Sequence, residues 1–353
     1  MTGEAKSSVG RFFEDFAVGE VIHHATPRTI THGDVSLYTA LTGSRFALPS
    51  GDTFARAVGY PRSPVDDLLV FHVVFGRTVA DISRNAILNL GYAGCRFLKA
   101  VYPGDTLTAI SEIIGLKEST NGRSGVVYVR SQGVDQEGER VLDYVRWVLI
   151  RKSEEGSPAP DPLVPDVPSA IAPDALGDAV PEIDAGEWDW RLSGSPSRHG
   201  DYVVGERIDH VDGMTIEEAE HQMAARLYQN SAKLHFNQIT EVNGRYGRRV
   251  VYGGHVISVA RALSFNGLQN AFQIAAINRG RHVMPVFAGD TIHAWSEVLD
   301  TASLPGREDV GALRLRLVAT KDRPCYDFPY AEPDGSYDPS VVLDLDYWAV
   351  LPR

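Results

Sequence analysis

The chain has 353 residues, more than one domain usually holds, which predicts two domains that are each large enough to bury a core. Its formal net charge is -12 and it contains no run of Lys or Arg, which argues against a nucleic-acid surface or an anionic membrane patch. The two cysteines, Cys95 and Cys325, form no CxxC or CxxH pattern, so we expect free thiols. No apolar stretch matches a signal peptide or a transmembrane helix, and we therefore expect a cytoplasmic protein.

In the middle of the chain, residues 153–197 are rich in proline set among Ala and Asp. Proline removes a backbone donor and fixes φ, so no regular helix or strand can run far in this segment. We interpret it as a surface linker. It separates an N-terminal unit, residues 1–152, from a C-terminal unit, residues 198–353.

The two units repeat the same motifs in the same order. The matching pairs are DFAVGE at 15–20 with DYVVGE at 201–206, GDT at 104–106 with GDT at 289–291, and VLD at 141–143 with VLD at 342–344. Three matches in one order predict an internal duplication.

Each unit is predicted to contain an apolar helix followed by several strands. In the first unit the helix runs from about His72 to Ser83, and the strands cover about 107–114, 126–131 and 142–150. In the second unit a polar helix covers 215–227 with a capping box from Thr215 to Glu218, an apolar helix begins at Gly253 or Gly254, and strands cover 286–298, 313–317 and 343–351. This order predicts an α+β fold in which a curved antiparallel sheet wraps a helix twice, with the two sheets joined edge to edge.

The candidate site lies directly after the predicted polar helix, in the run from Tyr228 to Asn237. Here Asn230 and His235 bring an amide and an imidazole to a helix exit, where both can contact one small ligand such as water. The structural alternative is that His235 is a half-buried core histidine and Asn230 a helix C-cap.

A comparison of the two units favours function for this pair. At a constant offset Ser44 stands opposite Asn230 and Pro49 opposite His235, and Val70 is taken as the counterpart of Gly253. The amide, the imidazole and the glycine therefore occur together only in the second unit. A glycine at a helix N-terminus offers a free N–H that can hold a developing oxyanion. The alternative for Gly253 and Gly254 is a tight turn that needs a positive φ.

Other polar residues fit less specific roles. His72 and His255 are taken as equivalent in the two units and are therefore interpreted as structural, and Asp105 and Asp290 are predicted to fix the turn into a strand. Four arginines, Arg45, Arg248, Arg249 and Arg281, are candidates for binding a carboxylate or phosphates. No HExxH, Walker or dinucleotide pattern is present.

The chain resembles the MaoC-like dehydratase family, which comprises the R-specific enoyl-CoA hydratases of double hot-dog fold. The resemblance rests on Tyr38-Thr39-Ala40-Leu41-Thr42-Gly43 in the first unit, and on Leu234-His235, Val251-Tyr252-Gly253 and Pro285-Val286-Phe287-Ala288-Gly289-Asp290-Thr291 in the second. It implies that His235 activates a water and that the Gly253 N–H binds the thioester oxygen. We expect Tyr228, Tyr252 and Gly254 to complete the substrate site.

The sequence departs from the family at Asn230, where the family has Asp. An amide orients a water but cannot take its proton, so proton transfer would fall on His235. The run from Gln229 to Asn237 most resembles mesaconyl-CoA hydratases, also called β-methylmalyl-CoA dehydratases, whose substrate carries its own carboxylate. That charge would conflict with a protein Asp.

The resemblance thus implies a hydro-lyase that reversibly hydrates mesaconyl-CoA. The alternatives are a general R-specific enoyl-CoA hydratase, a hot-dog acyl-CoA thioesterase and a catalytically silent acyl-CoA-binding protein. We expect no metal and no cofactor beyond the CoA of the substrate, no nucleic-acid or membrane partner, and leave a homo-oligomer open.

Overall fold

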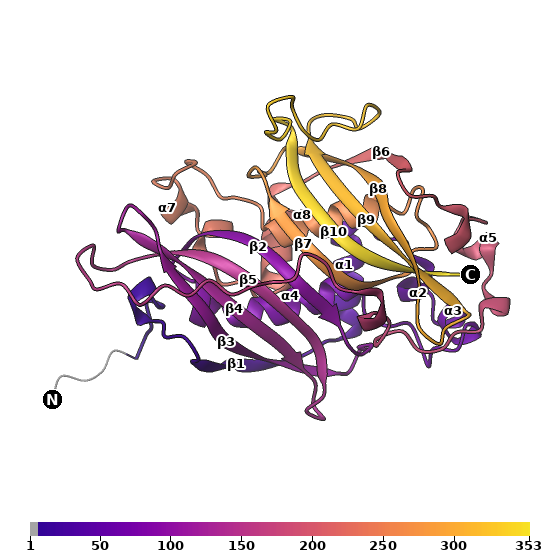
Figure 1. Cartoon of the computed structure of the whole chain (residues 1–353), viewed down its shortest axis with the longest axis horizontal. Helices are drawn as coiled ribbons and strands as arrows, with labels where there is room; N and C mark the ends of the chain where they lie inside the picture. The colour runs from indigo at the N-terminus through magenta and orange to yellow at the C-terminus, as the bar shows by residue number, and fades with distance from the viewer. Residues whose placement is uncertain (1–5) are drawn as a thin grey trace.

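The computed structural model describes residues 6–353, and the ten strands in this part of the chain form one antiparallel sheet (Figure 1). The strands are β1 (Val21–Thr29), β2 (Ala86–Phe97), β3 (Thr106–Glu118), β4 (Ser124–Val134), β5 (Arg140–Arg151), β6 (Arg207–Thr215), β7 (Gln273–His282), β8 (Thr291–Ser303), β9 (Val310–Lys321) and β10 (Val341–Pro352). Their order is β1-β3-β4-β5-β2-β7-β10-β9-β8-β6, so each unit supplies five neighbouring strands. The prediction of two sheets joined edge to edge is confirmed, and β2 and β7 form the junction.

Two apolar helices lie against this sheet, one from each unit (Figure 1). Helix α4 (Asp67–Thr78) packs against β1, β3, β4 and β5, and α8 (Gly253–Leu263) packs against β6, β8, β9 and β10. The other helices are short or polar: α1 (His32–Thr42), α2 (Ala47–Ser50), α3 (Asp52–Ala57), α5 (Trp190–Ser193), α6 (Glu218–Leu227) and α7 (Gln238–Glu241).

Both apolar helices are buried over almost their whole length, from Leu68 to Thr78 in α4 and from Gly254 to Leu263 in α8. A helix that is apolar all round must be covered on every side. The sheet covers one side, and side chains of α1, α6 and the opposite unit cover the rest, so the largest apolar cluster runs through both units.

The proline-rich segment contains no long helix or strand, as predicted, but it is more than a surface linker. Its buried apolar side chains are Ile171, Leu176, Ala179, Val180, Ile183 and Trp188. Several of them pack with Trp348 of β10 in a second core cluster, and the Trp348 indole N–H donates to the Ile171 carbonyl oxygen at 3.1 Å. The segment therefore helps to hold the C-terminal unit.

The start of the polar helix differs from the prediction. Thr215 is the last residue of β6, and its hydroxyl lies 2.8 Å from that of Thr291 across the β6–β8 ladder. The helix begins at Glu218, and Glu220 rather than Glu218 accepts a hydrogen bond, at 3.2 Å, from the backbone N–H before the helix. Thr215 therefore belongs to the sheet and not to the helix cap that the capping-box pattern predicted.

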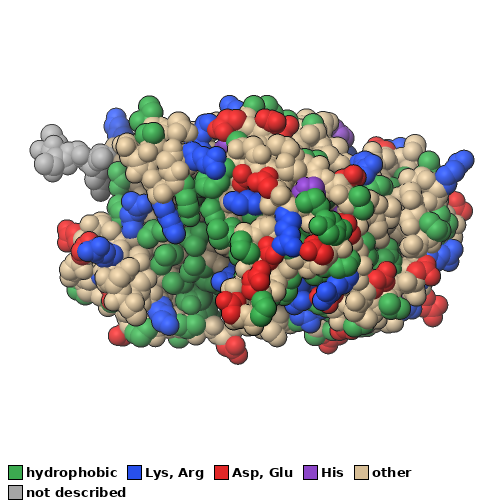
Figure 2. All heavy atoms as spheres, turned by 90° about the horizontal axis from the view of Figure 1, so that it is seen from above, with side chains coloured by type: hydrophobic (Ala, Val, Ile, Leu, Met, Phe, Trp, Pro, Cys, Tyr) green, Lys and Arg blue, Asp and Glu red, His purple; other side chains and the backbone are tan. Residues whose placement is uncertain are grey.

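In the described residues no helix combines the length and hydropathy that are needed to cross a bilayer. On the face shown in Figure 2, Lys and Arg side chains are interspersed with Asp and Glu, and hydrophobic side chains gather in a band. Charge on this face is therefore mixed.

Candidate active site

Asn230 is held in one orientation by the turn that ends α6. Gln229 has a φ of 52°, and the Asn230 N–H donates to the Ala225 carbonyl oxygen at 2.9 Å. The Asn230 Oδ1 accepts from the Ala232 N–H at 3.0 Å. Since the amide oxygen accepts this bond, Nδ2 is the group that can donate to a ligand.

His235 is held by one hydrogen bond that fixes its tautomer. Its Nδ1 lies 2.9 Å from the Val250 carbonyl oxygen, so Nδ1–H donates and Nε2 remains as an acceptor. Burial lowers the pKa of His235 to about 4, which keeps the imidazole neutral at pH 7. The Val250 N–H donates in turn to the Leu234 carbonyl oxygen at 3.0 Å, which ties the loop to the segment before α8. His235 is therefore prepared to accept a proton through Nε2.

A row of rings joins His235 to helix α4 of the other unit. The ring centres are 5.5 Å apart for His235 and Tyr252, 5.8 Å for Tyr252 and Tyr228, and 4.5 Å for Tyr228 and His72. Tyr228 and Tyr252 are 1% and 3% exposed. The structure thus brings the predicted tyrosines together with His235 at the boundary between the units.

The glycines at the start of α8 allow close packing. A Cβ on Gly254 would lie 2.5 Å from the Tyr252 ring and 2.6 Å from the His72 ring. Neither Gly253 nor Gly254 has a left-handed φ, so the alternative of a tight turn with positive φ is wrong. Their N–H groups have no acceptor within the helix, and the positive end of the helix dipole lies there. This end of α8 can hold a negatively charged oxygen.

A second imidazole, which the sequence analysis missed, packs over Gly253. A Cβ at this position would lie 2.5 Å from His282 Cε1, and His282 Nε2 is 3.4 Å from the Tyr92 hydroxyl. Burial, with a smaller contribution from His235, lowers the pKa of His282 to about 4. Phe97 pairs with Leu142, and His282 pairs with the corresponding Leu343, so Phe97 is the counterpart of His282 in the first unit. A polar residue found only in the second unit was the sequence signal that could have identified His282.

The register of the two helices corrects one predicted correspondence. Val65 and Val251 donate equivalent backbone hydrogen bonds, at 2.8 and 2.9 Å, shortly before α4 and α8 begin. Gly253 therefore corresponds to Asp67, the first residue of α4, and the predicted correspondence with Val70 is wrong. The second unit still has a glycine where the first has a bulky polar residue.

The same register separates the two histidines that were taken as equivalent. His72 corresponds to Ser258, and its Nε2 lies 2.9 Å from the Ser258 hydroxyl across the two helices. His255 lies one helical turn earlier, is 1% exposed, and its Nδ1 has no hydrogen-bond partner. The predicted equivalence is therefore wrong, although both side chains lie in the core.

The four candidate arginines lie on the surface or near it, each with its own partner. Arg45, Arg248 and Arg281 are exposed and stack on Phe265, Phe287 and Tyr337, and Arg249 pairs with Glu218. The predicted role of Asp105 and Asp290 is confirmed: they accept backbone N–H bonds at 2.8 and 2.9 Å that close the turns before β3 and β8.

Among residues 6–353, three acidic side chains, Asp135, Glu137 and Glu139, gather closely enough to suggest a metal site. The Lys99 ammonium lies among them, 2.7, 3.2 and 2.5 Å from their oxygens. This cluster is an ion-pair network on the surface of the first unit.

Comparisons with known proteins agree with this arrangement. The family model described as mesaconyl-CoA hydratase matches residues 3–328. The chain is 60% identical to a β-methylmalyl-CoA dehydratase of Chloroflexus aurantiacus, over 99% of both chains. It is 56% identical to a mesaconyl-CoA hydratase of Cereibacter sphaeroides, over 99% of this chain and 100% of that protein.

Solved structures give the same result for the fold. A MaoC domain protein dehydratase from Chloroflexus aurantiacus superimposes with a TM-score of 0.97 at 60% identity, over 99% of both chains. A Mycobacterium tuberculosis protein with a double hotdog fold superimposes with a TM-score of 0.75 at 25% identity, over 98% of this chain and 99% of that one. The predicted double hot-dog fold is confirmed. The chain belongs to the mesaconyl-CoA hydratase family of MaoC-like proteins.

Proposed function

We propose that this protein catalyses the reversible addition of water to mesaconyl-CoA, which gives β-methylmalyl-CoA. The two relatives that share 60% and 56% of its residues are named for the two directions of this reaction. On the structural side, the observation that carries the proposal is His235: its free Nε2 belongs to a neutral imidazole that packs against Tyr252, the residue directly before α8.

Hydration of an α,β-unsaturated thioester needs a base and a site for negative charge. The water oxygen adds to the β-carbon, and charge develops on the thioester oxygen until a proton reaches the α-carbon. In the proposed mechanism His235 Nε2 takes one proton from the water and returns a proton to the α-carbon. A neutral imidazole suits both steps, because it accepts a proton at pH 7 and releases it readily.

The thioester oxygen is proposed to bind at the start of α8. The N–H of Gly253 has no acceptor in the helix, and the helix dipole favours negative charge at this end. Such a donor stabilises the enolate more than the neutral thioester, which lowers the barrier.

Asn230 is proposed to orient the water. Its Nδ2 can donate to the water oxygen, which leaves both water protons free for His235 or other acceptors. An Asp at this position would offer an acceptor and a negative charge beside a substrate that is itself a carboxylate. The amide avoids that repulsion.

The reaction as proposed requires no metal or redox cofactor, because the thioester itself acidifies the α-carbon. CoA enters as part of the substrate. Tyr228, Tyr252 and Gly254 are proposed to line the acyl site, since their rings and backbone surround His235 and the start of α8.

One incubation separates this proposal from its rivals. Purified protein and mesaconyl-CoA should give β-methylmalyl-CoA with loss of the enoyl-thioester absorbance and no free CoA. Free CoA without hydration would identify a thioesterase, and binding without either product would identify an acyl-CoA-binding protein. The thioesterase is less favoured because Asn230 offers no carboxylate to activate water.

We further propose that the protein acts in the cytoplasm and without a nucleic-acid partner. Cys95 and Cys325 are both buried and unpaired, which is common in reducing compartments. The proposal leaves open whether the protein forms a homo-oligomer. Light scattering on the purified protein measures its molar mass and answers this.

A further inference from the structure

A fully buried arginine lies near the proposed site without an acidic partner. Arg146 on β5 points toward α4 and is 0% exposed. Its guanidinium donates to the Thr78 hydroxyl at 2.9 Å and to the Ser83 hydroxyl at 3.3 Å, and stacks on Phe75 at 4.3 Å. Its Nε has no hydrogen-bond partner. In residues 6–353, no Asp or Glu oxygen lies within 4.0 Å of this guanidinium.

The side chains that the guanidinium contacts, Thr78, Ser83 and Phe75, are neutral. Its charge also acts on His24, which is hydrogen-bonded to Asp81 at 2.7 Å. Burial lowers the pKa of Arg146, and the ionisable neighbours that counteract this are the tyrosines Tyr144, Tyr92 and Tyr252. The Tyr144 hydroxyl also has no hydrogen-bond partner. A buried cation without an anion is costly, and proteins rarely keep one unless something compensates it. An anion bound beside the Arg146 guanidinium would therefore be stabilised by its charge.

Aromatic rings separate Arg146 from His235. It pairs directly with Tyr92 in the β2–β5 ladder, and Tyr92 lies against His282. On the other side, the ring of Phe75 is 5.6 Å from that of Tyr252, which packs against His235. These rings connect Arg146 to the start of α8, where the thioester is proposed to bind.

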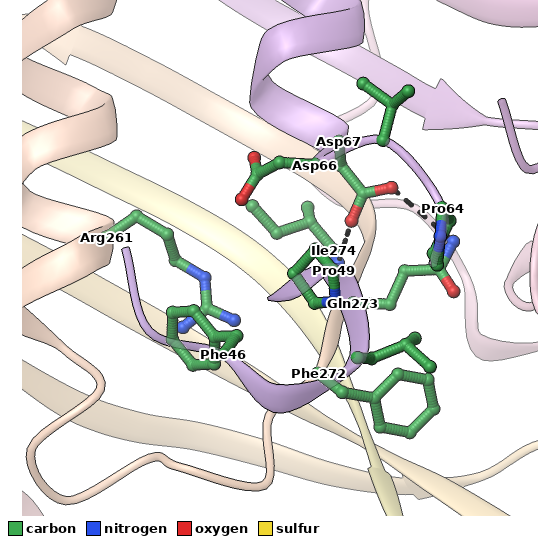
Figure 3. A pocket seen from close by; sticks show the side chains of 11 residues that line it. Phe46, Pro49, Pro64, Asp66, Asp67, Arg261, Phe272, Gln273 and Ile274 are labelled. Carbon is green, nitrogen blue, oxygen red and sulfur yellow. Dashed lines mark hydrogen bonds between the residues drawn. The ribbon is translucent and has the colours of Figure 1, made fainter. Parts of the chain in front are cut away.

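The internal repeat creates a corresponding pocket at the start of α4, where no substrate is expected. There Arg261 takes the position of Phe75, and Tyr347 takes the position of Arg146 after the repeated VLD motif. Asp66 takes the position of Tyr252, and Figure 3 shows its carboxylate facing the same pocket as Arg261. Burial raises the pKa of Asp66 and the charge of Arg261 opposes this rise, so the two charges interact.

The two corresponding sites therefore differ in what accompanies the buried arginine. At the start of α4, beside Pro49, the carboxylate of Asp66 accompanies Arg261. At the start of α8, beside His235, Tyr252 and Phe75 take the places of Asp66 and Arg261. Arg146 takes the place of Tyr347 there, and no carboxylate of the described chain lies within 4.0 Å of its guanidinium. Building on the proposed function, we propose that Arg146 binds the carboxylate of the acyl group and so makes the enzyme specific for dicarboxylic acyl-CoA substrates. Arg is suited to this role because its planar fork pairs with both carboxylate oxygens.

The test compares Arg146→Met with the wild-type enzyme on two substrates. These are mesaconyl-CoA and 2-methylcrotonyl-CoA, in which a methyl group replaces the carboxylate. The substitution should lower kcat/KM for mesaconyl-CoA by at least about 100-fold, as truncation of one partner of a buried charge pair does. It should change kcat/KM for 2-methylcrotonyl-CoA by less than about threefold, since the lost contact involves the carboxylate alone.

Arg261→Met is the matched control, because it removes the buried arginine of the corresponding pocket at the start of α4 and should leave the ratio of the two kcat/KM values unchanged. Arg146→Lys keeps the charge without the fork and should lower the ratio by about tenfold. If Arg146→Met does not fold, as judged by circular dichroism, the Lys variant decides the question.

Two results would overturn the assignment of Arg146. One is a folded Arg146→Met enzyme that loses activity equally on both substrates, and the other is an unchanged ratio in the Met or the Lys variant. These results differ from failure of the proposed function itself. That failure would appear in the wild-type enzyme as no hydration of mesaconyl-CoA.

Discussion

Replacement of His235 by Ala should remove most of the turnover while the protein remains folded. The substitution breaks the 2.9 Å hydrogen bond to Val250, worth about 0.5–1.5 kcal/mol. It also removes the ring contact with Tyr252, worth a further ~0.5–1.5 kcal/mol. At about 2–4 °C for each kcal/mol, these two losses should lower the melting temperature by about 2–12 °C. The loss of a general acid–base group should cost about 10²–10⁴ in rate.

The assay follows the enoyl-thioester absorbance with saturating mesaconyl-CoA, beside a thermal melt of each protein. Pro49→Ala is the control, because Pro49 occupies the equivalent place in the first unit and should retain most activity. A loss of less than about tenfold in a folded His235→Ala enzyme would remove His235 from the mechanism, since an essential proton-transfer group contributes more than this.

Three further changes test the surroundings of His235. Asn230→Asp should lower activity on mesaconyl-CoA, because the new charge repels the substrate carboxylate, and an increase would show that the amide impairs the enzyme. Between pH 8 and pH 6, kcat/KM should vary by less than about twofold, because the pKa of His235 is lowered to about 4 and the imidazole stays neutral above that pH. A fall in kcat/KM centred at the ordinary histidine pKa, about 6.5, would contradict this. Gly254→Ala places a Cβ 2.5 Å from a neighbouring ring and should cost about 1–3 kcal/mol of stability, whereas Gly200→Ala, with open space at its Cβ, should melt as the wild type does.

The internal repeat made the fold predictable. Two similar sets of motifs on either side of a proline-rich segment required two similar sheets, and the structure has five strands from each unit. The loop with Asn230 was also correctly compared with the first unit: Gly43 and Gln229 both have a left-handed φ, of 68° and 52°, so Ser44 leaves its helix where Asn230 does.

Errors arose where identical residues misled the comparison. Histidines at 72 and 255 suggested one alignment of the two helices, whereas backbone hydrogen bonds from Val65 and Val251 define another. The register defined by these bonds keeps the offset that relates Ser44 to Asn230, whereas the two histidines suggested an offset three residues shorter. Thr215 was misassigned for a different reason, because pairing with Thr291 in the sheet outcompeted its preference for a helix N-terminus.

His282 and Arg146 were missed because the sequence patterns of their strands do not show that these side chains face the interior. β7 lies in the middle of the sheet and is buried from Gln273 to Asn278, so it lacks the alternation that identifies a half-buried strand. β5 does alternate, but an arginine in such a strand is ordinarily assigned to the solvent side. Only the packing of α4 over the strand shows that Arg146 points inward.

The measurement that tests the central claim most directly is kcat/KM for hydration of mesaconyl-CoA and of crotonyl-CoA in one buffer. A pocket that pairs the substrate carboxylate leaves a buried polar group unpaired when that carboxylate is absent, which strongly disfavours the analogue. The account predicts that mesaconyl-CoA is preferred by at least about 10³. Comparable values for the two substrates would contradict it, and the protein would then be a general R-specific enoyl-CoA hydratase.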